Sequence, residues 1–104
     1  MPQRPYVVGD TPLVQITITS GDDGTALDLS HADASATLRW RVNGASVQEE
    51  AMTAVNASGG VFKRRWNVGD LSGEGTVLFE VLAIDKDGNR FTSQQFRRDI
   101  RRRL

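Results

Sequence analysis

The stretch from Gly75 to Phe96 constrains the fold of this chain more than any other part of the sequence. Its first half places apolar side chains at every second position, as on one face of a β-strand, namely Val77, Phe79, Val81 and Ala83. The segment 85–88 (Asp-Lys-Asp-Gly) then predicts a tight turn, because aspartate side chains bond nearby backbone and glycine adopts positive φ readily. Phe91 and Ser93 continue as a return strand. The stretch therefore predicts a β-hairpin.

The opposite face of the first strand of this hairpin is also largely apolar. It carries, in order, Leu78, Glu80, Leu82 and Ile84. A strand face left to water is normally polar, so this composition predicts that something covers the face. The cover is either a second layer of the same chain or another subunit, and the choice between them bears directly on function.

Several other segments alternate with the same period of two. Their inward-facing residues are Val14, Ile16 and Ile18 in segment 13–19, Ala36, Leu38, Trp40 and Val42 in segment 35–42, and Phe62, Arg64 and Trp66 in segment 61–68. The pair Asn43-Gly44 predicts a hairpin turn, which favours a return strand over a short helix for residues 47–55. Residues 20–24 and 56–60 read as turns or loops, and Leu71 is expected to plug the core.

These segments together define the expected fold class. No segment shows the 3.6-residue period of a long helix, and glycine-rich turns separate about seven short strands. The pattern predicts an all-β fold, an immunoglobulin-like two-sheet antiparallel β-sandwich of about seven strands. We expect a single domain over residues 1–104, with a short N-terminal arm (residues 1–5) and an arginine-rich C-terminal end (residues 97–104). Phe96 and Ile100 should extend the last strand beyond a β-bulge.

Composition excludes several classes of protein. The chain has no cysteine, which removes disulfides, thiolate metal sites and thiol nucleophiles. The N-terminal residues lack an apolar run of signal-peptide length, and no segment approaches the ~20 apolar residues of a membrane span. We therefore expect a soluble protein that is not exported by the usual route and has no membrane partner.

The arginines near the C-terminus form the strongest charge signal. Residues 1–96 carry 8 basic and 12 acidic side chains, a net charge of −4, whereas residues 97–104 carry five arginines and one aspartate, a net charge of +4. The arginines are Arg97, Arg98, Arg101, Arg102 and Arg103. They could form a solubilising, frayed end, dock on an acidic surface of a neighbouring subunit, or clamp nucleic-acid phosphates. Because the rest of the chain is acidic, we favour docking on a neighbouring subunit over binding to nucleic acid, and we do not expect nucleic acid as a partner.

The residues capable of chemistry do not form a recognisable site. Ser30 and His31 are adjacent, so in an extended segment they point to opposite faces and make a poor nucleophile–base pair. The spacing of Asp85, Asp87 and Asn89 resembles the start of a calcium loop, but Gly88 comes too early and Phe96 stands where the bidentate glutamate belongs. Asp22-Asp23-Gly24 is likewise better explained as a turn, and nothing places Glu49 and Glu50 across a substrate. We predict no catalytic residues, no metal and no cofactor, and hence no enzyme.

The two tryptophans allow a choice between core and binding surface. Trp40 and Trp66 are each in phase with the apolar face of their strand, which favours a core position. The alternative is that one of them is exposed and forms an aromatic platform for a carbohydrate.

The order of several short motifs suggests a family. They are residues 6–11 (Tyr-Val-Val-Gly-Asp-Thr), 27–30 (Leu-Asp-Leu-Ser) before the 36–42 strand, Trp66, 69–71 (Gly-Asp-Leu), Gly75 before the 77–83 strand, and 85–88 before Phe91-Thr92. This order resembles the immunoglobulin-like domain that begins the phage baseplate upper proteins, and related small tail proteins of siphophages. Two features differ from that pattern: Val77 stands where an aromatic residue is expected, and the stalk and helical parts that hold receptor-binding subunits have no counterpart in this sequence.

The resemblance implies a non-enzymatic structural component of a phage virion, a tail or baseplate protein made in the cytoplasm of the host bacterium. The expected partners are other phage tail or baseplate proteins, in a symmetric assembly with multiple copies. Leu78, Leu82 and Ile84 would pack against these neighbours, and the arginine-rich end would fix their register. The alternatives are a capsid decoration or head–tail joining protein and, from another class, a carbohydrate- or host-surface-binding module.

Overall fold

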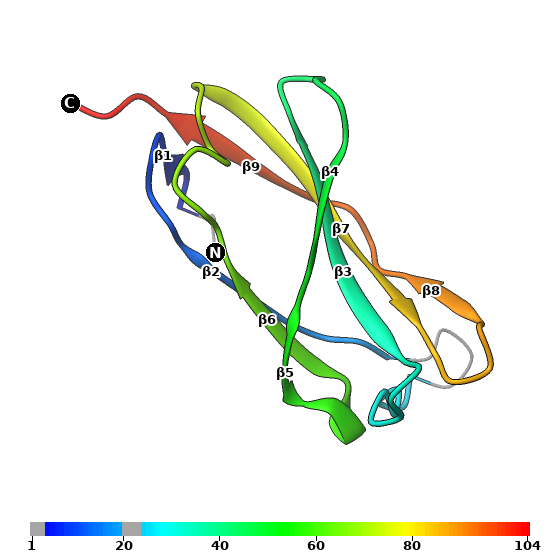
Figure 1. Cartoon of the computed structure of the whole chain (residues 1–104). Coiled ribbons are helices and arrows are strands. Elements are labelled where there is room, and N and C mark those ends of the chain that lie inside the picture. Colours follow the sequence, from blue (N-terminus) through cyan, green and yellow to red (C-terminus); the bar gives the residue numbers. More distant parts are fainter. Residues whose placement is uncertain (1–3, 20–23) are drawn as a thin grey trace.

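The computed structural model describes residues 4–19 and 24–104, which form two β-sheets packed face to face (Figure 1). The strands are β1 (Tyr6–Val7), β2 (Leu13–Thr17), β3 (Ser35–Val42), β4 (Gln48–Ala51), β5 (Thr53–Asn56), β6 (Val61–Arg65), β7 (Gly75–Ile84), β8 (Arg90–Thr92) and β9 (Phe96–Arg101). One sheet has the order β1-β9-β7-β3-β4, with β8 also paired to β7, and the other has the order β2-β6-β5. The expected all-β fold of two layers is confirmed.

The nine strands of the described residues correspond to seven continuous runs of chain, as the sequence predicts. β4 and β5 are separated by Met52 alone, whose buried side chain marks the point where one run leaves the first sheet and joins the second. β8 and β9 both pair along the same edge of β7. Thr92 lies opposite Leu82 and Phe96 lies opposite Phe79, so the outer run has one extra residue. This is the expected bulge, and the Ser93 hydroxyl fills it by accepting a hydrogen bond from the amide of Val81 (2.9 Å).

The expectation of purely antiparallel sheets is wrong at one strand. β1 runs parallel to β9, with Tyr6 opposite Ile100 and Val7 opposite Arg101. The reason is topological: β1 and β9 come from opposite ends of the chain, so no tight turn joins them and nothing forces the antiparallel direction. Figure 1 shows β1 beside the end of β9. The large sheet is therefore mixed.

The core lies between the sheets and follows the predicted alternation. The inner residues of β7 are all buried, with exposed fractions of 6% or less, and they are Val77, Phe79, Val81 and Ala83. Trp66 occupies the centre, with its ring edge-to-face on Trp40 (centroids 5.2 Å apart), on Phe79 (5.7 Å) and on Tyr6 (6.1 Å). Leu71 is completely buried, as a plug should be. Residues 48–51 and 53–56 are strand, so the helical alternative for this segment is wrong.

A buried cation lies among these aromatic rings. The Arg64 side chain is 8% exposed, and its guanidinium carbon lies 4.7 Å from the centroid of the Trp40 ring. Its Nη2 donates to Oδ2 of Asp70 (3.1 Å), and the same carboxylate oxygen accepts from the Asn67 amide (2.8 Å). The pair therefore fixes the loop between β6 and β7 on the core.

The turn after β3 is also held from a distance. Asn43 has a φ of 52°, its side-chain amide donates to the carbonyl of Glu74 (2.9 Å), and its Oδ1 accepts from the amide of Thr76 (2.9 Å). Gly75 lies between these two contacts with a φ of 137°, and a Cβ at this position would lie 1.9 Å from Oδ1 of Asn43. A glycine is therefore required where β7 begins.

Some sequence-based expectations fall on residues 1–3 and 20–23, which lie outside the described residues. They are the first part of the N-terminal arm, the turn after β2 and the Asp22-Asp23 pair. The loop at residues 56–60 is described, and it contains a single 3₁₀ turn, η1 (Ala57–Gly59), capped by the side chain of Asn56.

Candidate functional site

The outer face of the six-stranded sheet is the surface that the sequence singles out. The three-stranded sheet packs on the inner face of the large sheet, where the buried residues of both sheets form one core. On the outer face, Leu78 is 36% exposed, and Leu82 and Ile84 are partly buried. These three residues are called the apolar stripe below. In the described part of the chain, no second layer covers the stripe.

The stripe is bordered by polar and cationic residues on the neighbouring strands. Its cross-strand neighbours are Thr37 and Thr92 beside Leu82, Ser35 and Arg90 beside Ile84, and Arg41 and Arg97 beside Leu78. Leu78, which lies between two arginines, is the most exposed of the three, whereas Leu82, which lies between two threonines, is partly buried.

Glu80 interrupts the stripe and is neutralised within the sheet. Nη1 of Arg39 lies 3.8 Å from a carboxylate oxygen of Glu80, and Nε of Arg39 lies 3.5 Å from Glu49 on β4. Arg41 and Arg97 form no ion pair with any described residue. The face therefore combines an apolar centre with arginines that have no carboxylate partner among the described residues.

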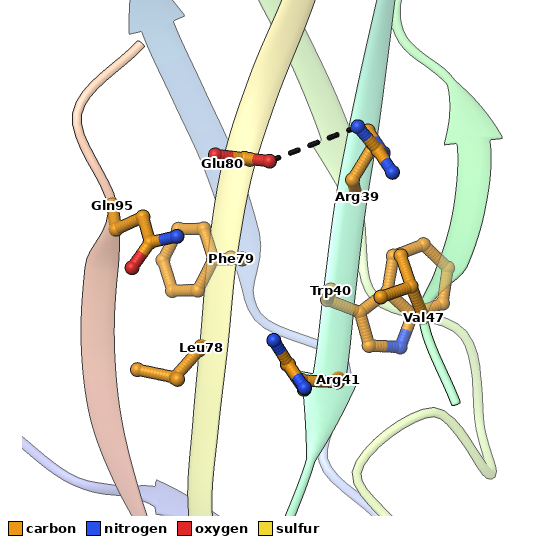
Figure 2. A pocket seen from close by; sticks show the side chains of 8 residues that line it. All are labelled: Arg39, Trp40, Arg41, Val47, Leu78, Phe79, Glu80 and Gln95. Carbon is orange, nitrogen blue, oxygen red and sulfur yellow. Dashed lines mark ion pairs between the residues drawn. The ribbon is translucent and has the colours of Figure 1, made fainter. Parts of the chain in front are cut away.

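A shallow hollow opens between β7 and β3 in this face. Figure 2 shows Leu78 and Glu80 on one strand and Arg39 and Arg41 on the other, with Gln95 at one side and Val47 beside Trp40. Its volume is about 60 Å³, whereas pockets that enclose small-molecule ligands hold roughly 300–1,000 Å³. The hollow therefore suits an inserted side chain better than a small-molecule ligand.

The arginine-rich end lies partly within the sheet and partly along its edge. Residues 97–101 belong to β9. Beyond it, Arg102 donates to Glu74 (2.8 Å), and Arg103 donates to the carboxylate of Asp10 and to the carbonyl of Val8 (3.2 Å). The charges of Arg102 and Arg103 thus have partners inside the chain.

The alternation of β9 separates the remaining arginines. Arg97 and Arg101 lie on the outer face, with Arg97 opposite Leu78. Arg98 points the other way, with its guanidinium carbon 5.2 Å from the centroid of the Tyr6 ring and its Nη1 donating to the carbonyl of Arg4 (3.3 Å). Of the eight residues predicted for an interface, the structure brings these five together on one face: Leu78, Leu82, Ile84, Arg97 and Arg101.

Sequence reasoning did not include the arginines of β3 in this surface. Arg39 and Arg41 lie across from Glu80 and Leu78. The sequence does predict that both side chains point outward, because they alternate with Leu38, Trp40 and other core residues of the same segment. What the sequence does not contain is the pairing of β3 with β7, which brings the two outward rows together.

The candidate catalytic residues stay apart. The Ser30 hydroxyl donates to Asp28 (2.6 Å), while Nδ1 of His31 accepts from the amide of Asp33 (3.1 Å). The hydrogen bonds from the Ser30 hydroxyl and amide lower the pKa of Asp28 below its ordinary value of 3.8. Serine and histidine are therefore each engaged in a local turn, with different aspartates.

The Asp85 segment is the hairpin turn that the sequence predicts. The amides of Asp87 and Asn89 both donate to Oδ1 of Asp85 (2.9 Å each), and the Asn89 side chain donates to Oδ2 (3.2 Å). Desolvation raises the pKa of Asp85, but the donors from Asn89 and Asp87 outweigh it and leave the pKa below 3.8. The carboxylate oxygens of Asp85 therefore accept hydrogen bonds within the turn, which is the role expected in a hairpin rather than in a calcium loop.

Both tryptophans belong to the core, as the alternation of their strands predicts. Trp40 is 5% exposed and Trp66 is 1% exposed. Stacking on a sugar requires an accessible ring face, so neither indole offers the platform on which the carbohydrate-binding alternative depends.

The described residues contain no metal site and no membrane-spanning helix, and the sequence comparisons give no match. Within residues 4–19 and 24–104, no group of three or more histidine, cysteine, aspartate or glutamate side chains is arranged to hold a metal ion. No helix in those same ranges is long and apolar enough to cross a membrane. No protein-family model matches the chain, and no curated protein matches it in sequence.

Proposed function

We propose that the chain is a non-enzymatic structural component of a phage virion, in the tail or baseplate, that docks on neighbouring subunits through the outer face of its six-stranded sheet. The observation that carries this proposal is the apolar stripe on a sheet face that the chain's own second sheet leaves open. Full burial of an exposed aliphatic side chain is worth about 1.5–3 kcal/mol, and these residues, which are already partly buried, would each contribute only a fraction of that against a neighbour. The phage context comes from the sequence resemblance. The outer face of the six-stranded sheet supplies the surface through which such a component would bind its neighbours.

The immunoglobulin-like character of the sandwich belongs to the same proposal. Three features support it: a buried tryptophan, Trp40, on β3, a strand run that passes from one sheet to the other at Met52, and seven runs in two layers. The unpaired guanidinium groups of Arg41 and Arg97 would orient the neighbour by charge-assisted hydrogen bonds to its carboxylates.

The proposal is tested by locating the chain and then disabling the stripe. Virions from the source organism are separated into heads and tails, and the chain is quantified in each fraction by mass spectrometry. We expect it in tails, at a small multiple of three or six copies per particle. Leu82→Glu is then introduced into the phage genome, and we expect it to abolish incorporation while the free chain remains folded.

The matched control is Val55→Glu, which adds the same carboxylate at an apolar residue that is 49% exposed on β5, away from the stripe. This variant should incorporate normally. Recovery of the chain with heads at high copy number would replace the tail assignment by capsid decoration. Absence from both fractions would overturn the structural role, and normal incorporation of Leu82→Glu would overturn the docking face.

A further inference from the structure

The edges of the two sheets differ in how they are protected against pairing with another strand. Exposed edges in proteins usually carry charges, bulges or prolines, or are very short, because their free backbone groups otherwise recruit other strands. β1 has two residues, β8 begins at Arg90, β4 carries Glu49 and Glu50, and β5 has an irregular register between Ala54 and Asn56. Each of these four edges is protected in one of the usual ways.

The free edge of β2 has no such protection. The strand is five residues long, with the sequence Leu-Val-Gln-Ile-Thr, and contains no charge, no proline and no bulge. β6 is its only partner strand in the described residues. Among the described residues, β2 is therefore an edge strand that carries none of the usual protections against pairing with another strand.

The hydrogen bonds of β2 show which backbone groups are open. The amide of Trp66 donates to the carbonyl of Pro12 (2.9 Å), and the amide of Ile18 donates to the carbonyl of Gly60 (2.8 Å). In an antiparallel ladder every second residue directs its backbone N–H and C=O toward the same neighbouring strand. The backbone groups of the even-numbered residues of β2 therefore point toward β6. The residues whose N–H and C=O groups face away from β6 are Leu13, Gln15 and Thr17.

Beside this edge the inner face of the large sheet is incompletely covered. A space of about 360 Å³ separates Ile16 and Ile18 from Phe91 and Phe96, and a second space of about 180 Å³ continues past Tyr6. These three aromatic residues are only partly buried, although they pack against the core. Inner-face residues of β1, β8 and β9 line these spaces, so the large sheet extends beyond β2. The two spaces together are called the groove below, and the large sheet forms its floor.

The floor determines what can occupy the edge. A second copy pairing through its own β2 would bring its own large sheet into the position that β8 and β9 already fill. A single extended segment has no such conflict. Its inward side chains would be apolar, to cover Phe91 and Phe96, and its outward side chains would be polar, next to Gln15 and Thr17.

Arg98 adds a charge requirement at one end of the groove. It lines the smaller space and forms no ion pair with any described carboxylate, since its Nη1 donates only to the carbonyl of Arg4. A carboxylate is the strongest acceptor for a guanidinium. We propose that the free edge of β2 accepts one extended strand from another protein, alternating in apolar and polar residues and carrying a carboxylate at the Arg98 end. This inference is independent of the proposed function.

The test uses the folded chain and a displayed library of random seven-residue peptides. We expect selected peptides to alternate between apolar and polar residues and to carry an acidic residue at one end. Gln15→Pro removes a donor from the free edge without touching the ladder to β6, and should weaken binding of the selected peptides at least tenfold. Arg98→Gln should selectively weaken the peptides that carry the acidic residue.

The matched control is Ala51→Pro. The amide of Met52 donates to the carbonyl of Ala36 (2.9 Å), so Ala51 faces the free edge of β4 just as Gln15 faces that of β2. Ala51→Pro should leave peptide binding unchanged. Should Gln15→Pro fail to fold, hydrogen exchange on the wild-type complex decides, with slowed exchange expected at the amides of Leu13, Gln15 and Thr17. Failure to select any peptide, or binding that leaves these three amides unprotected, would overturn the proposal.

Discussion

The two faces of β7 contain apolar residues for different reasons. On the inner face four consecutive alternate positions are buried against the second sheet and are exposed by 6% or less. On the outer face Leu78, Leu82 and Ile84 are reached by solvent and are bordered by arginine and threonine side chains. The comparison teaches that hydrophobicity alone does not separate core from interface in a strand. The second layer does, because the inner face lies against the three-stranded sheet whereas no described element lies over the outer face.

Val81→Asp should have the largest effect on stability. Val81 is 1% exposed, and the introduced carboxylate would be buried without a partner. We expect a loss of more than about 4 kcal/mol, a large part of the ~5–15 kcal/mol of a domain this size. Urea unfolding followed by circular dichroism measures it. A folded variant with wild-type stability would show that the inner face is not the core.

Arg64→Ala should have the next largest effect on stability. It measures how much the buried ion pair between Arg64 and Asp70 contributes on the inner side of the sandwich. Removing the guanidinium leaves Asp70 without its partner beside the aromatic core, at a cost of about 3 kcal/mol. The matched variant is Arg39→Ala, whose ion pairs lie on the outer face and contribute under about 1 kcal/mol. Equal losses in the two variants, compared in the same urea titration, would remove the distinction between the faces.

Leu82→Glu should change stability little, by under about 1 kcal/mol, although it is adjacent to Val81. Leu82 is already partly exposed between two threonines, so the new carboxylate can reach water. Thermal unfolding of the purified chain checks this expectation. Unfolding of Leu82→Glu at room temperature would assign the outer face to the core and would leave the docking surface without support.

Asp85→Asn should have the smallest effect, confined to acid. The folded pKa of Asp85 lies below 3.8, so its ionised form contributes stability above that pH, and the contribution is lost as pH falls through the folded pKa. The variant should therefore show a flatter loss of stability below about pH 3.8, measured by urea unfolding at a series of acidic pH values. A variant that keeps the wild-type acid profile would show that the turn carboxylate is not linked to folding.

Much of this fold can be read from alternation. The segments around Val14, Leu38, Phe62 and Val81 each predict their strand and their buried side correctly, because period and burial are local properties. The Asn43-Gly44 turn and the bulge before Phe96 were also expected from the sequence, although the contacts of Asn43 with Glu74 and Thr76 were not.

What the sequence could not supply depends on pairing between distant segments. The parallel direction of β1 and the partners of Arg98, Arg102 and Arg103 all join residues that lie more than 25 positions apart. For the candidate site, the apolar stripe was predictable from β7 alone. The arginines beside it on β3, and the open edge of β2, follow only once the order of strands in each sheet is known.

The parallel pairing of β1 with β9 also determines how the sandwich carries mechanical load. A force that pulls on the chain before Tyr6 and after Arg101 slides these two strands along each other, because both run in the same direction. The ladder bonds, with the hydrogen bond from the Val8 amide to the Arg101 carbonyl (3.0 Å), are then loaded together in shear rather than opened one at a time. Forced unfolding is governed by the unfolding rate, and a shear clamp keeps that rate low. Tension along the chain would thus be resisted at the strands that join its two ends.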